Sequence, residues 1–84
     1  STDFPNWNDL CNVPLTRNGN NVYAHILKEM QGNVTLKWKS KPKQVILLHD
    51  GKEVPFTYKN KEVYISLPNS RRGFIDDVLK IVWE

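Results

Sequence analysis

The fold is decided by the stretch Leu15-Thr-Arg-Asn-Gly-Asn-Asn-Val-Tyr-Ala-His-Ile-Leu27. Asn18-Gly19 accepts the positive φ angles of a tight turn, and apolar residues then recur at every second position from 22 to 26. Alternation with period two places one face of a strand in a core and the other outside. The stretch therefore predicts a β-hairpin.

The rest of the chain repeats this pattern of short apolar segments separated by turn-forming residues. Besides 21–27, strands are expected at about 11–16, 33–38, 44–49, 54–58, 63–67 and 77–83. Pro14 limits the first of these to an edge or a bulge, because proline donates no backbone hydrogen bond. Residues 44–49 are almost continuously apolar, which predicts a strand covered on both faces. We expect an all-β fold, a small antiparallel β-sandwich of about seven strands.

The sequence divides into a short irregular start and one domain. Residues 1–9 have no periodicity and read as a leader or linker, with Phe4 and Trp7 as anchors on a surface. Residues 10–84 form a single β-sandwich domain. A chain of 84 residues buries only roughly 60% of its unfolded surface, so its stability is modest.

Charge and composition argue against several classes of partner. The net charge is +3, with lysines at 37, 39, 41 and 43. These lysines alternate with apolar residues and therefore lie on a solvent face, without the interleaved aromatic residues of a nucleic-acid groove. The single Cys11 excludes an internal disulfide. No run approaches the roughly 18 apolar residues of a membrane span, so we expect a soluble chain that binds neither nucleic acid nor membrane.

No catalytic, cofactor-binding or metal-binding constellation is predicted. His25 and His49 have no cysteine or carboxylate at a metal-ligand spacing. Asp76 and Asp77 are an acidic pair, but neighbours on a strand point to opposite faces and do not converge on one sugar.

Three aromatic residues are the candidates for contact with a sugar or a neighbouring domain. Tyr23 and Tyr64 lie opposite the apolar alternation of their strands, and Trp7 lies in the leader. An aromatic ring on an outward face can stack on a sugar or pack against protein. A carbohydrate-binding module that uses these surface aromatics is therefore one functional hypothesis.

The order of the motifs resembles the C-terminal β-sandwich domain of the α-L-fucosidase family of glycoside hydrolases. In that family a Thr-Arg/Lys-x-Gly-Asn turn precedes an aliphatic-Tyr-aliphatic-His-aliphatic strand, as in residues 15–27 here. Residues 43–51, 63–68 and 76–81 resemble later strands of the same domain, and Trp7 resembles the tryptophan of the linker before it.

This resemblance implies a non-catalytic accessory domain. Enzymes of the family are retaining hydrolases whose two carboxylates sit on an N-terminal (β/α)₈-like barrel, and none of that barrel lies in these 84 residues. The resemblance thus implies no hydrolase activity and no cofactor for this chain alone. Its partner would be the catalytic barrel, with a glycan as a second ligand. The compartment is left open, and export of the parent enzyme would make it secreted, periplasmic or lysosomal.

Overall fold

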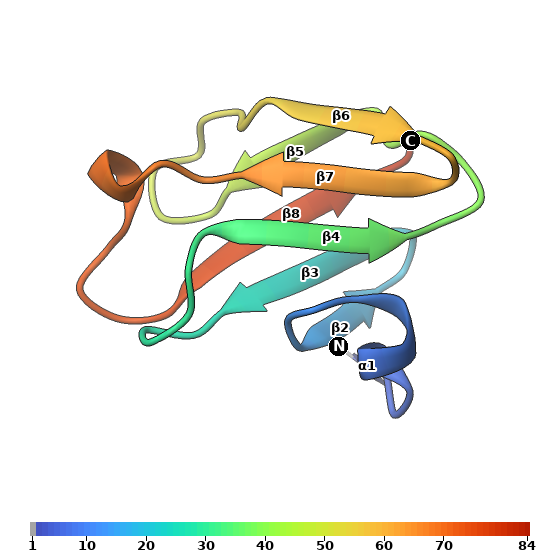
Figure 1. Ribbon diagram of the computed structural model, residues 1–84, viewed down its shortest axis with the longest axis horizontal. Coiled ribbons are helices and arrows are strands. Elements are labelled where there is room, and N and C mark those ends of the chain that lie inside the picture. Colours follow the sequence, from blue (N-terminus) through green and yellow to red (C-terminus); the bar gives the residue numbers. More distant parts are fainter. Residues whose placement is uncertain (1) are drawn as a thin grey trace.

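The computed structural model describes residues 2–84, which form two antiparallel sheets packed face to face (Figure 1). The larger sheet has the order β1 (Thr2–Asp3), β2 (Leu15–Asn18), β3 (Asn21–Ile26), β8 (Asp77–Val82), β5 (Gln44–Leu47). The smaller sheet has the order β4 (Asn33–Lys37), β7 (Glu62–Ser66), β6 (Phe56–Lys59). Two short helices, α1 (Trp7–Leu10) and η1 (Asn69–Arg71), complete the described elements. The predicted all-β sandwich is confirmed, with seven strands of four or more residues and the two-residue β1 within this range.

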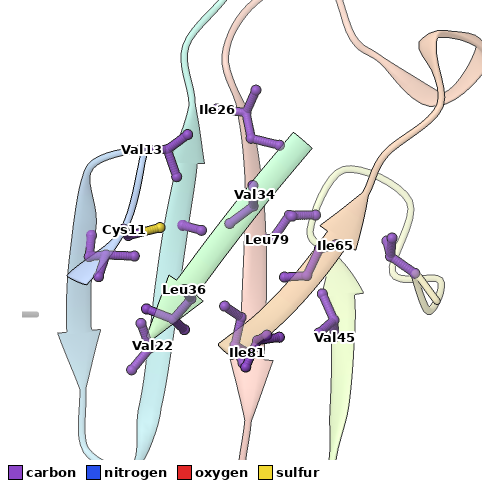
Figure 2. Packing of buried hydrophobic residues seen from close by; sticks show 14 of the residues in the cluster. Cys11, Val13, Val22, Ile26, Val34, Leu36, Val45, Ile65, Leu79 and Ile81 are labelled. Atoms are coloured by element: carbon purple, nitrogen blue, oxygen red, sulfur yellow. The ribbon is translucent and has the colours of Figure 1, made fainter. Parts of the chain in front are cut away.

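The core lies between the two sheets and is formed by the inward positions of each alternating strand. Figure 2 shows side chains from both sheets, such as Leu36 of β4 and Leu79 of β8, meeting in this layer. The largest side chains there are almost fully buried. Burial of apolar area at about 25 cal/mol per Å² is the main force that holds the sheets together.

Two hairpin turns follow the residue types that their geometry requires. Gly19 has φ +64° at the first central position of the β2–β3 turn, which is the type II′ arrangement. Asn60 and Lys61 have φ +53° and +62° between β6 and β7, which is type I′. This second turn was predicted one residue earlier, at 59–60.

The strand predicted at 11–16 is wrong as a single strand. Cys11 bridges to Leu36 of the smaller sheet, whereas β2 begins at Leu15 and pairs with β3 in the larger one. The side chain of Asn12 bonds both edges of this crossing, donating to the Asn33 carbonyl at 2.8 Å and accepting from the Thr35 amide at 2.9 Å. The chain changes sheets here because Pro14 has no N–H with which to continue a ladder.

The prediction that residues 44–49 are covered on both faces is also wrong. Val45 and Leu47 are buried against the smaller sheet, but Ile46 is half-buried and Leu48 is 48% exposed. β5 is an edge strand, and no second layer of the described chain lies over its outer face. The apolar residues on that face therefore remain in contact with solvent.

The N-terminal stretch packs on one end of the sandwich. β1 pairs with β2, and Phe4 is buried with its ring edge-on to Trp38 at 6.3 Å between centroids. Trp38 stacks in turn on Trp83, which joins the ends of the two sheets. The division into a leader at 1–9 and a domain at 10–84 stays a prediction. Within residues 2–84, no helix is long and apolar enough to cross a membrane.

Candidate functional site

The three predicted contact residues lie on different parts of the surface. Tyr64 is at the centre of the smaller sheet, on its outer face, and is 41% exposed. Tyr23 is half-buried on the outer face of the larger sheet, which is the opposite side of the sandwich. Trp7 is half-buried in α1 and packs against the core. The fold does not bring these rings together into one stacking platform.

Tyr64 lies in a shallow hollow on the smaller sheet. Register places Thr35 of β4 and Thr57 of β6 directly beside it on either side. The hollow has a volume of about 390 Å³, and Asn33 and Ser66 add an amide and a hydroxyl to its lining. An aromatic ring among uncharged hydroxyl and amide groups suits a neutral polyhydroxylated ligand better than an anion.

Tyr64 is held by a neighbour on its own strand. Its hydroxyl donates a hydrogen bond to the carboxylate of Glu62, and this bond raises the pKa of Tyr64 above its usual value. Glu62 also lies in register between Lys37 and Lys59. The ring therefore stays protonated at neutral pH, with its hydroxyl directed along β7.

His25 occupies the outer face of the larger sheet and has a structural environment. Its Nε2 lies 2.9 Å from the hydroxyl of Thr16 on the adjacent strand. Partial burial lowers the pKa of His25, and the nearby charge of Asp76 opposes that shift. Neutral imidazole is the form that this face of the sheet favours.

The acidic pair at 76 and 77 is divided between two roles, as the sequence predicted. Asp77 is 2% exposed, and its carboxylate pairs with the Arg72 guanidinium at 2.6 Å. Asp76 is exposed and accepts a hydrogen bond from the Lys28 amide at 2.7 Å. Both carboxylates are occupied in fixing a loop.

The remaining reactive groups are separate from one another. Cys11 is buried, and burial raises the pKa of its thiol, which makes the thiolate unfavourable. Within residues 2–84, no three His, Cys, Asp or Glu side chains gather closely enough to hold a metal ion.

Comparison with known proteins identifies the architecture through structure rather than sequence. No protein-family model and no curated protein matches the sequence. Among solved structures, alpha-L-fucosidase isoenzyme 1 from Paenibacillus thiaminolyticus superposes with a TM-score of 0.67 and 25% identity. The match covers 95% of this chain. This chain resembles a domain of an α-L-fucosidase. It spans only 20% of the length of that fucosidase, so four fifths of the fucosidase has no counterpart here.

The fucosidase resemblance, predicted from the order of motifs, is thereby confirmed. A retaining glycosidase uses two carboxyl groups about 5–5.5 Å apart on either side of the scissile bond. In this fucosidase-like domain the adjacent acids Asp76 and Asp77 are instead bound to Lys28 and Arg72.

The most exposed apolar residues were missed by sequence reasoning, which assigned 71–75 simply to a loop. Phe74 is 96% exposed and Ile75 is 76% exposed. The available signal was two large apolar residues placed together in a segment that is otherwise charged or polar.

Proposed function

We propose that this chain is the non-catalytic, C-terminal accessory β-sandwich of an α-L-fucosidase-like glycoside hydrolase, which packs against the catalytic barrel of the same enzyme. The observation that carries this proposal is the match over 95% of this chain and 20% of the fucosidase. A whole domain that corresponds to one fifth of an enzyme is the relation expected of an accessory part.

The chemistry of the surface supports a role without catalysis. Hydrolysis with retention needs a nucleophile and an acid/base carboxyl that face one sugar ring. Asp77 is buried in an ion pair, and Asp76 accepts a backbone hydrogen bond from another loop. These residues stabilise the fold, and the reaction belongs to the barrel.

The test compares the 84-residue chain with the complete natural polypeptide that contains it. We expect the complete polypeptide to release fucose from an aryl fucoside and the 84-residue chain to release none. Fucose release by the short chain would contradict the non-catalytic role. A natural polypeptide without a catalytic domain would refute the proposal as a whole.

Binding of a neutral sugar is a second candidate function, favoured by the open Tyr64 hollow with its flanking threonines. Titration of the 84-residue chain with fucose, followed by NMR, would then shift the amide signals of β4, β6 and β7. Tyr64→Ala should abolish these shifts, and Tyr23→Ala, on the opposite face, should retain them. Shifts that survive Tyr64→Ala would exclude this site.

A further inference from the structure

The loop between η1 and β8 presents two large apolar side chains to solvent. Phe74 and Ile75 are 96% and 76% exposed, more than any other large apolar residue of the described chain. They lie at the end of the sandwich where the loop leads into β8, beside the connection from β3 to β4 (Figure 1). Monomeric proteins rarely leave such pairs uncovered without a function in binding.

The base of this loop is fixed by a dense set of polar contacts. The Arg72 guanidinium pairs with buried Asp77 at 2.6 Å and donates to the carbonyls of Met30 at 2.7 Å and Leu27 at 3.2 Å. The Gly73 amide donates to the same Asp77 carboxylate at 3.0 Å. A buried charge pair is costly to desolvate, so it holds the loop in one geometry only when its hydrogen bonds are satisfied.

The exposed tip continues into the uncovered face of the larger sheet. Leu48, at the end of β5, and Val78, in β8, line one hollow of about 560 Å³ with Phe74 and Ile75. We call these four residues the Phe74 patch. The patch is contiguous because the Leu48 amide donates to the Val78 carbonyl at 3.0 Å.

We propose that the Phe74 patch is the surface by which this domain docks on the catalytic domain of its own polypeptide. This inference rests on the proposed function. The match covers nearly all of this chain and leaves four fifths of the fucosidase outside it, so a large covalently linked neighbour is the expected occupant. A domain of about 300 residues has a radius of gyration of about 19 Å and is wide enough to reach one end of a sandwich 31 Å long.

The size of the patch favours a linked partner over a second copy. Four side chains of this kind bury on the order of 400–500 Å² together, well below the roughly 800 Å² per partner of a stable interface between separate chains. A covalent connection raises the effective concentration of the partner to the millimolar range, so a small apolar contact is sufficient.

The experiment replaces the exposed tip in two contexts. The double variant Phe74→Ser/Ile75→Ser and the control Lys41→Ser/Lys43→Ser, which truncates two other exposed side chains, are made in the 84-residue chain and in the complete polypeptide. In the short chain we expect neither variant to change the calorimetric unfolding midpoint. In the complete polypeptide we expect only the Phe74/Ile75 variant to lower the midpoint of this domain by several degrees and to separate it from the barrel transition.

The outcomes separate the inference from the function on which it rests. Equal midpoints for both variants in the complete, active polypeptide would overturn the docking surface and leave the accessory role intact. Concentration-dependent dimerisation of the short chain that Phe74→Ser/Ile75→Ser abolishes would identify a second copy as occupant, and would also overturn it. A natural polypeptide without a catalytic domain refutes the proposed function itself.

Discussion

The two outer faces of the sandwich differ in how they meet water. On the smaller sheet, the outward positions beside Tyr64 are Thr35 and Thr57, whose hydroxyls are hydrated without cost. On the larger sheet, the outward positions near β5 include Ile46 and Leu48, and the exposed Phe74 tip adjoins them. An antiparallel sheet with one solvated face carries polar residues at alternate positions, and only the smaller sheet follows this rule throughout. The difference indicates that a further layer covers the end of the larger sheet.

Breaking the base of the apolar loop should have the largest effect on this contrast. Asp77→Ala leaves the Arg72 guanidinium without its carboxylate in a largely buried position, so we expect a loss of about 3–5 kcal/mol in the free energy of unfolding. Chemical denaturation measures the loss. Asp76→Ala is the matched control, because this neighbour is exposed and accepts one hydrogen bond, and it should cost about 1 kcal/mol. Equal costs for the two variants would show that the buried pair does not hold the loop.

A stabilising change is expected at the turn of the polar sheet. Lys61 has φ +62°, a left-handed conformation that is unfavourable for a residue with a Cβ atom. Lys61→Gly creates the Asn-Gly pair that type I′ turns prefer and should raise the free energy of unfolding by about 0.5–1 kcal/mol. The same measurement on Lys59→Gly, which replaces a residue within β6, should show a decrease. A decrease for Lys61→Gly would contradict the turn geometry.

The smallest effect concerns His25 and the pH dependence of the larger sheet. Its pKa is lowered in the folded state by burial, so the folded chain binds this proton less readily than the unfolded chain does. The contribution of His25 is therefore fully present above about pH 6.5, the usual histidine value, and is lost as the pH falls through the folded pKa. His25→Gln should flatten the stability profile between about pH 7 and pH 5. An unchanged profile in this variant would assign the dependence to other groups.

The fold could be predicted from the sequence because its signals are local. Alternation at 21–27 and the turn at Asn18-Gly19 each specify a strand or a turn within a few residues. The sheet change at Pro14 could not be placed, since it depends on the pairing of Cys11 with a strand far along the chain. Coverage of 44–49 was misjudged because an apolar run has the same composition whether its second face meets its own chain or another.

The candidate sites were predicted less completely than the fold. Tyr64 was expected on an outward face and is found there, because strand alternation fixes the side to which it points. The exposed tip at Phe74 was missed, since exposure in a loop depends on contacts such as Arg72 with Asp77 rather than on any period. Loop residues need the three-dimensional structure before their role can be inferred.

Amide hydrogen exchange in the complete polypeptide tests the central claim most directly. The claim is that the domain belongs to a larger hydrolase and is covered at the Phe74 patch while its other turns stay in water. We predict that exchange at Phe74 and Ile75 slows in the complete polypeptide relative to the 84-residue chain, whereas exchange at Asn60 and Lys61, in the exposed turn of the smaller sheet, is the same in both. Equally fast exchange at Phe74 and Ile75 in the two contexts would contradict the account.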